Sequence, residues 1–188
     1  MKIGVMGGTF DPIHLGHLCA AEAAREGLAL DRVVFVPAHV PPHRGGVAPA
    51  LDRYAMVCLA TAGSAAFIPS DAELRRDGPS YTVDTVNALT QAHPDDSFVL
   101  IVGSDTYPEM ATWRDPEGIF SRCGVAVVGR AGAETFGAPL RPGVLRVSGP
   151  GLDVSSTAIR QRLREGKSAR FLVPESVLDY IAKRGLYR

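Results

Sequence analysis

Short apolar runs alternate along this chain with segments in which apolar residues recur at helical spacing. The runs are typical of strands buried on both faces of a sheet, and they lie at 3–6, 33–36, 65–68, 97–102 and 125–128, with a further candidate at 144–147. Helical spacing is found at 14–27, 51–62 and 83–93. A strand, a helix and a second strand with short connections form a parallel crossover unit. We therefore predict an α/β fold, a Rossmann-like doubly wound sheet of five or six parallel strands with helices on both faces.

Length and charge limit the classes of protein that this chain can belong to. Its 188 residues contain no internal repeat, and they are enough to bury the core of one domain, which we expect to span 1–188. Twenty Lys and Arg residues balance twenty Asp and Glu residues. Because the formal net charge is zero, no global field attracts nucleic acid or an acidic membrane, and any anion site must be local.

Cysteine usage and hydropathy both favour a cytoplasmic protein. Cys19, Cys58 and Cys123 are widely spaced and form no Cys-x-x-Cys pair, which argues against a disulfide framework or a metal cluster. The apolar start runs into Gly7 too early for a signal peptide, and no long apolar span follows. We expect a soluble chain in a reducing compartment.

The segment from Gly7 to His17 carries the clearest chemical signal. Two glycines end the first predicted strand and an alanine-rich helix follows, so the amides of the helix N-terminus can point at an anion. His14 and His17 share one face of this helix and can both donate to phosphate oxygens. The spacing matches neither a Walker loop nor a dinucleotide fingerprint. Capping and packing are the alternative for the two histidines, whereas zinc lacks further ligands.

A second candidate phosphate site lies at 155–160. Ser155 and Ser156 mark the start of a helix, and Arg160 follows one turn beyond Ser156 on the same face. Hydroxyls, free amides and a guanidinium would then converge, and the fork of arginine matches phosphate oxygens bidentately. Helix capping with a surface arginine is the alternative.

Several polar residues follow predicted strands, at the edge of a parallel sheet where ligands bind. His43 and Arg44 lie in a loop rich in proline and glycine after the second strand, and Arg130 follows the fifth. Asp105 follows the strand at 97–102, where a carboxylate could accept hydrogen bonds from a ribose or could cap the next helix.

A further helix N-terminus and the single tryptophan are candidates for substrate recognition. Ser80 or Thr82 is predicted to cap the helix at 83–93, and the free amides there favour a small carboxylate, although simple capping is the alternative. Trp113 has polar neighbours, so its indole suits either the edge of a ligand cleft or ordinary packing.

The segment from Gly7 to His17 resembles the signature of the nucleotidyltransferase superfamily, which shares its His-x-Gly-His element with class I aminoacyl-tRNA synthetases. Further blocks extend the resemblance to bacterial nicotinate-nucleotide adenylyltransferases over essentially the whole chain, at 41–44, 73–82, 103–105 with Trp113, 155–160 and 180–188. The first block and the block at 155–160 would equally suit a phosphopantetheine adenylyltransferase. The middle blocks and the tail favour the nicotinate-nucleotide family.

This resemblance implies an enzyme of NAD biosynthesis that transfers AMP from ATP to nicotinate mononucleotide, giving deamido-NAD and pyrophosphate. It implies Mg²⁺ carried with ATP and no metal site formed by protein alone. The partners would be ATP and nicotinate mononucleotide, without nucleic acid or membrane, and a homo-oligomer is left open. A nucleotide sensor without turnover would be expected to lack part of the phosphate site, but His14, His17, Ser156 and Arg160 are all intact.

The resemblance also implies roles for individual residues. His14, His17 and Arg160 would be catalytic. ATP would be bound by Gly7, Gly8, Thr9, Phe10, His14, His17, Gly103, Asp105, Ser155, Ser156 and Arg160, and the helices after about residue 155 would complete its site. Nicotinate mononucleotide would be bound by His43, Arg44, Tyr81, Thr82, Asp105, Trp113 and Arg130. Because the attacking phosphate is already ionised, catalysis would rest on alignment and charge neutralisation without a general base.

Overall fold

The computed structural model describes residues 1–41, 47–129 and 139–188 of the chain. The strands are β1 (Lys2–Gly8), β2 (Arg32–Pro37), β3 (Phe67–Pro69), β4 (Ser97–Gly103), β5 (Gly124–Gly129) and β6 (Leu145–Ser148). The helices are α1 (Leu15–Gly27), α2 (Ala50–Thr61), α3 (Thr82–Ala92), α4 (Pro116–Arg122), α5 (Ser156–Arg164) and α6 (Glu175–Arg184), with a 3-10 helix η1 (Tyr107–Thr112). The strands form a six-stranded sheet in the order β3-β2-β1-β4-β5-β6, and every neighbouring pair is parallel. The predicted fold class is confirmed.

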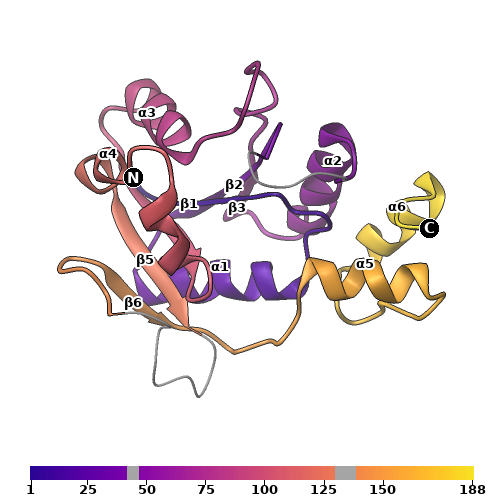
Figure 1. The fold of residues 1–188 in the computed structure, drawn as a ribbon. Helices are drawn as coiled ribbons and strands as arrows, with labels where there is room; N and C mark the ends of the chain where they lie inside the picture. Colours follow the sequence, from indigo (N-terminus) through magenta and orange to yellow (C-terminus); the bar gives the residue numbers. More distant parts are fainter. Residues whose placement is uncertain (42–46, 130–138) are drawn as a thin grey trace.

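Helices cover both faces of this sheet, and the central strands send alternate side chains to each face. In β4, Phe98, Leu100 and Val102 pack with residues of α3, α4 and η1, whereas Val99 and Ile101 pack with residues of α1 and α2. Figure 1 shows α3 and α4 on one side of the sheet and α1 on the opposite side. Burial on both faces explains why the central strands are continuous apolar runs.

The topology places a crevice beside β1. The chain builds β1, β2 and β3 outward in one direction and then returns through α3 to β4, which pairs with the other side of β1. The connections that follow β1 and β4 belong to opposite faces, because α1 packs on one face and η1 on the other. In sheets of this order, ligands bind at the carboxyl ends of the strands at this reversal point.

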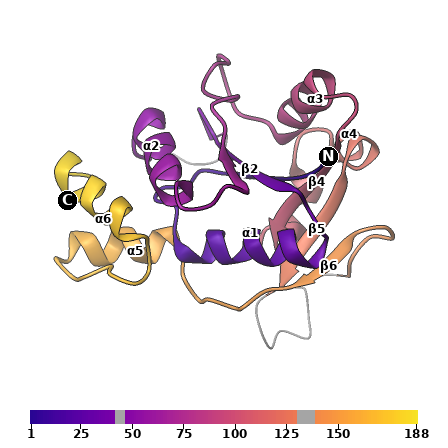
Figure 2. The ribbon, with the colours of Figure 1, turned by 180° about the vertical axis from the view of Figure 1, so that it is seen from behind.

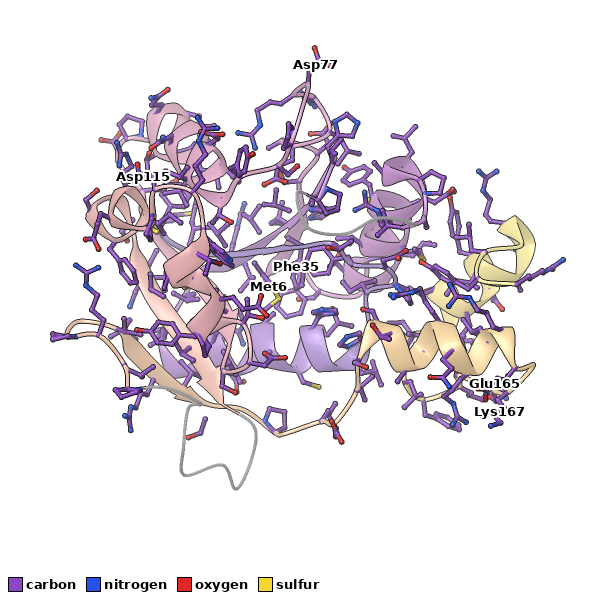
Figure 3. All side chains as sticks on the ribbon, viewed as in Figure 1. Met6, Phe35, Asp77, Asp115, Glu165 and Lys167 are labelled. Carbon is purple, nitrogen blue, oxygen red and sulfur yellow. The ribbon has the colours of Figure 1, made fainter. Side chains whose placement is uncertain are left out.

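The helices α5 and α6 lie at one end of the molecule, beyond the sheet, in both ribbon views (Figures 1 and 2). Buried Ile159 of α5 and Val177 and Ile181 of α6 belong to the same core cluster as α1 and α2. Figure 3 shows Glu165 and Lys167 at the rim of this end, where they form an ion pair at 2.7 Å.

Among the helices that the structure describes, none combines the length and the apolar character that a membrane span needs.

Two helix starts differ from the sequence-based expectation. α1 begins at Leu15 and His14 is its N-cap residue, so the first histidine precedes the helix. The prediction that Ser80 or Thr82 caps α3 is wrong, because the N-cap residue is Tyr81 and it makes no side-chain cap hydrogen bond. The Ser80 hydroxyl instead accepts a hydrogen bond from the His39 amide at 2.9 Å.

Candidate active site

A cavity of about 710 Å³ lies at the carboxyl ends of β1, β4 and β5, where the topology predicts a ligand. Gly7 and Gly8 of β1, Gly103 of β4 and Gly129 of β5 all line it. Its volume is within the range of about 300–1,000 Å³ that is usual for small-molecule sites. The first turn of α1, the first turn of α3 and the start of α5 complete the walls.

His14 and His17 lie together in the cavity wall at the start of α1. Their ring centroids are 3.7 Å apart and the rings are stacked with an interplanar angle of 27°. Phe10 packs edge-on against His17 with a centroid distance of 5.1 Å. Gly16 makes room for this arrangement, because a Cβ there would lie 3.0 Å from both Cε1 and Nδ1 of His14. The glycine of the His-x-Gly-His element is therefore explained by packing against the first histidine.

The protonation of both histidines follows from their surroundings. Burial lowers the pKa of His14 to about 4, so its imidazole is neutral at physiological pH. The His14 amide donates to Nδ1 of His17 at 3.2 Å. Since that ring nitrogen accepts, the neutral ring of His17 carries its proton on Nε2. His14 is thus a neutral ring, and its buried Nδ1 has no hydrogen-bond partner among the described residues, whereas His17 presents Nε2 as a donor.

The start of α5 is anchored to the segment that precedes α1. Ser155 caps α5, with its hydroxyl accepting from the Ala158 amide at 3.2 Å. The Ser156 hydroxyl donates to the Pro12 carbonyl at 2.9 Å. Arg160 Nη1 donates to the Asp11 carbonyl at 2.8 Å and lies 3.7 Å from the Asp11 carboxylate. The two predicted phosphate-binding segments are therefore joined directly, although about 144 residues separate them.

At the other end of the cavity lie Tyr81, Thr82 and Trp113. Thr82 opens α3, and the half-buried Trp113 follows η1. Arg114 places its guanidinium 4.8 Å from the centroid of the Tyr81 ring and 3.7 Å from Asp84. An aromatic ring, an indole and a helix N-terminus therefore share one wall, which suits an aromatic ligand that carries a negative charge.

The first turn of α3 rests on a buried carboxylate. Glu73 is 6 % exposed and lines the cavity, and it accepts a hydrogen bond from the Thr85 hydroxyl. Burial raises the pKa of Glu73, while its hydrogen bonds and Arg76, at 3.7 Å, oppose that shift. Arg76 also donates to the Thr85 hydroxyl at 2.6 Å. This cluster fixes the turn that precedes Thr82.

Asp105 lies on the cavity wall just after β4 and is exposed. Its Oδ1 accepts from the Thr106 amide at 3.0 Å, so the carboxylate turns back over the end of the strand. A Cβ on Gly103 would lie 2.5 Å from that oxygen, so a larger residue there would displace the Asp105 carboxylate from this position. Asp105 thus caps its own loop, and it also faces the cavity where a ribose hydroxyl could reach it.

The structure brings most of the predicted site residues to one cavity. Its lining includes Gly7, Gly8, Thr9, Phe10, His14, His17, Tyr81, Thr82, Gly103, Asp105, Trp113, Ser155 and Ser156. Arg160 lies beside this lining, with its guanidinium on the Asp11 carbonyl and the Thr157 hydroxyl. His43, Arg44 and Arg130 lie outside the described residues.

Four buried or half-buried polar residues that support the site were given no role of their own from the sequence, although three of them lie in the blocks that carry the family resemblance. They are Asp11, Arg53, Glu73 and Tyr187. One signal was present at Arg53, because it stands three and four residues before Met56 and Val57 on the inward face of α2. A charged residue on an apolar helix face requires buried partners. The partners themselves come from distant segments, which spacing alone does not reveal.

Within the ranges 1–41, 47–129 and 139–188, no three His, Cys, Asp or Glu side chains come together in a way that would hold a metal ion. The cavity wall near His14 and His17 instead offers hydroxyl groups and imidazoles. Mg²⁺ bound with a nucleotide takes most of its ligands from phosphate oxygens and water, with one or two carboxylates. Such a wall fits a metal that is held mainly by the nucleotide.

Comparison with known proteins agrees with this geometry. Residues 5–162 match the family model described as cytidylyltransferase-like. The chain is 48 % identical over 188 residues to a probable nicotinate-nucleotide adenylyltransferase of Thermus thermophilus, and the match covers all of both chains. The chain belongs to the nicotinate-nucleotide adenylyltransferase family. A second relative of the same name, from Geobacter sulfurreducens, is 42 % identical over 212 residues, with 100 % of this chain and 98 % of the relative covered.

Solved structures confirm the fold of this family for the chain. A nicotinic acid mononucleotide adenylyltransferase of Plasmodium falciparum, complexed with NaAD, superimposes with a TM-score of 0.83 at 18 % identity, covering 99 % of this chain and 97 % of the other. The same parasite enzyme complexed with APC gives a TM-score of 0.79. The predicted family is therefore confirmed, and this nucleotidyltransferase family uses ATP.

Proposed function

We propose that this chain transfers the adenylyl group of ATP to the phosphate of nicotinate mononucleotide, as the names of its relatives indicate. An oxygen of the mononucleotide phosphate attacks the α-phosphorus of ATP. The bond from that phosphorus to the bridging oxygen breaks, and the electron pair leaves with pyrophosphate. The products are deamido-NAD and pyrophosphate.

The observation that carries this proposal is the difference between the two ends of the cavity. One end combines the glycine turn after β1, the stacked pair His14 and His17, and the hydroxyls of Ser155 and Ser156. The other end combines the N-terminus of α3 with the rings of Tyr81 and Trp113. The first set suits a polyphosphate and the second suits an aromatic carboxylate. Together they suit the two substrates of one adenylyl transfer.

At the phosphate end, this chain acts by alignment and charge neutralisation. His17 would donate from Nε2 and His14 from its neutral ring to oxygens of the α- and β-phosphates, with Gly7, Gly8, Thr9 and Phe10 shaping the turn. Because the attacking phosphate is already ionised, neither histidine has to take up a proton, and Arg160 supplies the positive charge near this turn. When bound, Mg²⁺ supplies further neutralisation of charge on the phosphate oxygens.

The helix α5 would hold the far end of the triphosphate. Ser155, Ser156 and the first amides of α5 face the cavity, and Arg160 adds a positive charge one turn further on. Because Arg160 is tied to the Asp11 carbonyl, its charge stays close to the turn that carries the α-phosphate. In this view the segment after about residue 155 completes the ATP site.

At the substrate end, Thr82 and the amides of the first turn of α3 would receive the nicotinate carboxylate, and Tyr81 and Trp113 would contact the ring. Gly103 and Asp105 would receive a ribose. His43, Arg44 and Arg130 stay predictions for the mononucleotide phosphate, since they lie outside the described residues. A carboxylate-binding turn favours the acid over the amide, which lacks the charge.

Pyrophosphate release tests this proposal directly. We would supply ATP and Mg²⁺ with nicotinate mononucleotide, nicotinamide mononucleotide or phosphopantetheine in parallel. We expect kcat/KM for the first to exceed that for the second by about tenfold or more. Trp113→Ala should raise KM for the mononucleotide and leave KM for ATP unchanged, while Trp113→Phe should restore most of the affinity. Release only with phosphopantetheine would refute nicotinate mononucleotide as the substrate. No release with any of the three would refute the proposed enzymatic activity.

A further inference from the structure

Arg53 is a buried cation that hydrogen-bonds to three separate segments of the chain. It lies in the first turn of α2 and is 1 % exposed. Its Nε donates to the Ala48 carbonyl at 2.9 Å, its Nη1 to the Thr9 carbonyl at 2.8 Å and its Nη2 to the His39 carbonyl at 3.0 Å. Each nitrogen of the guanidinium therefore holds a different piece of backbone.

Two of these three carbonyls belong to segments that are connected to the two ends of the cavity. Thr9 lines the cavity in the turn after β1, where we place the phosphates of ATP. His39 follows β2 and is joined to the turn before α3, because its amide donates to the Ser80 hydroxyl at 2.9 Å and its Nδ1 lies 2.9 Å from the Arg76 carbonyl. The Ser80 amide in turn donates to the Val40 carbonyl at 2.9 Å.

These contacts form a continuous connection from one substrate end to the other. It runs from Thr9 through Arg53 and His39 to Ser80, which lies two residues before Thr82 and the first turn of α3. Arg53 itself is not part of the cavity lining. Its influence on a bound substrate must therefore pass through the backbone segments that it holds.

An arginine side chain is suited to holding three backbone carbonyls at once, and no other residue type would replace it. A planar guanidinium presents donors in fixed directions, whereas a lysine ammonium is a single head on a flexible stem. Burial lowers the pKa of Arg53, and the Asp11 and Glu73 carboxylates oppose that shift. Leaving a buried cation without partners is costly, and here three backbone carbonyls accept from it.

We propose that Arg53 is a positioning residue that fixes the distance between the phosphate turn at Thr9 and the substrate turn at Ser80, and so aligns the two substrates. The inference rests on the proposed adenylyl transfer. Each turn can still bind its own ligand when Arg53 is lost, because each keeps its own lining. The alignment of the mononucleotide phosphate with the α-phosphorus is what suffers.

Separate measurement of binding and turnover tests this inference. We would compare Arg53→Ala and Arg53→Lys with the parent by calorimetric Kd for ATP with Mg²⁺, by Kd for nicotinate mononucleotide, and by kcat. We expect each Kd to change little and kcat to fall about 100-fold, a loss that a misplacement of about 1 Å can cause. Substitution of a residue with a merely structural role would not lower kcat while leaving both Kd values unchanged.

Met56→Ala is the matched control, because Met56 lies on the same inward face of α2, is fully buried and bonds to none of these carbonyls. It should lower the melting temperature as Arg53→Ala does but keep kcat at a temperature where both variants are folded. Guanidinium chloride at low millimolar concentration should restore part of the activity of Arg53→Ala, because the ion fits the three carbonyls. Urea, which has a similar shape but no charge, should not.

The outcomes separate the two claims. Equal loss of kcat in Arg53→Ala and Met56→Ala, or a rise in both Kd values as large as the fall in kcat, would overturn the positioning role. If Arg53→Ala does not fold, Arg53→Lys carries the test, and a parental kcat in that variant would also overturn it. A parent enzyme that releases no pyrophosphate with nicotinate mononucleotide would instead refute the proposed function.

Discussion

The Tyr187 hydroxyl donates a hydrogen bond to Asp11 Oδ1 at 2.6 Å and so joins two segments 176 residues apart. Asp11 is 2 % exposed, and the same oxygen accepts from the Ala48 amide at 3.1 Å. Burial and the Asp11 carboxylate both raise the pKa of Tyr187, so the hydroxyl keeps its proton and stays a donor. The Asp11 carbonyl also accepts a hydrogen bond from Arg160, so this tyrosine helps to hold the turn at 9–12 in place.

Tyr187→Phe should therefore lower both stability and activity. Removing the hydroxyl leaves a buried carboxylate oxygen with one donor fewer, which costs about 1–3 kcal/mol. We expect the free energy of unfolding in urea to fall by that amount and kcat/KM for ATP to fall with it, because the Asp11 side chain loses one of the two donors to its Oδ1 and the turn that also holds Arg160 is less firmly fixed.

Tyr180→Phe is the control for that substitution. The Tyr180 hydroxyl also donates to a buried carboxylate, Asp52 Oδ1 at 2.7 Å, but this pair lies between α6 and α2 and not beside the cavity. It should lower stability by a similar amount and leave kcat/KM unchanged. Equal losses of activity in both variants would mean that Tyr187 acts on the fold alone.

Arg160→Ala should reduce turnover more strongly than binding. Loss of one charged donor to a phosphate in the transition state typically lowers kcat about 100- to 1,000-fold. Steady-state kinetics with saturating nicotinate mononucleotide measure this effect. Arg164→Ala, at an exposed position on the same helix, should retain the parental kcat. A parental kcat in Arg160→Ala would remove Arg160 from the ATP site.

The pH dependence of stability should report the burial of His14. Its pKa is about 4 in the folded chain and 6.5 when unperturbed, so between these values the unfolded chain binds more protons. The free energy of unfolding should therefore be highest above pH 6.5 and fall as the pH falls toward 4. At about 1.4 kcal/mol per pKa unit, His14 accounts for about 3 kcal/mol of that fall.

Comparison with His14→Gln isolates this contribution, because all other titrating groups are shared. We expect urea unfolding between pH 4.5 and 7.5 to show a shallower decline in the variant than in the parent. Identical slopes in the two proteins would show that His14 is not held neutral by the fold.

Alkylation of Cys19 should depend on bound nucleotide. Cys19 lines the cavity and is half-buried, whereas burial raises the pKa of the Cys123 thiol to about 11, which keeps it protonated. In the variant Cys58→Ser, maleimide should therefore label Cys19. ATP at about 100 times its Kd should slow labelling about 100-fold, because only the free enzyme reacts. Labelling that ATP does not slow would place the nucleotide elsewhere in the cavity.

Most of the fold and part of the site could be predicted from local patterns. A strand buried on both faces must be continuously apolar, and such runs gave the central strands of the sheet. The turn from Gly7 to His17 and the start of α5 were recognisable because glycines, histidines and capping serines are adjacent in sequence. Even here the cap of α3 was predicted wrongly, since the Ser80 hydroxyl is bound to His39, which belongs to another segment.

The supporting contacts could not be predicted in the same way. Arg53 bonds to Thr9 across 44 residues, and Tyr187 bonds to Asp11 across 176. Neither pair has a spacing that implies contact, and each forms only because α2 and the segment after α6 pack beside the turn that follows β1. The inward position of Arg53 on α2 indicated a buried charge, but the identity of the carbonyls that receive it required the fold.

These long-range contacts also bear on the order in which a folding chain acquires its properties. The turn at 9–12 is held by hydrogen bonds to residues that are far away in sequence, with separations of 44, 144, 149 and 176 positions. Contacts that close such long loops lose more chain entropy and tend to form after local structure. On dilution out of denaturant, helices, which need only local contacts, would thus return before activity. Catalytic competence would be the last property to return.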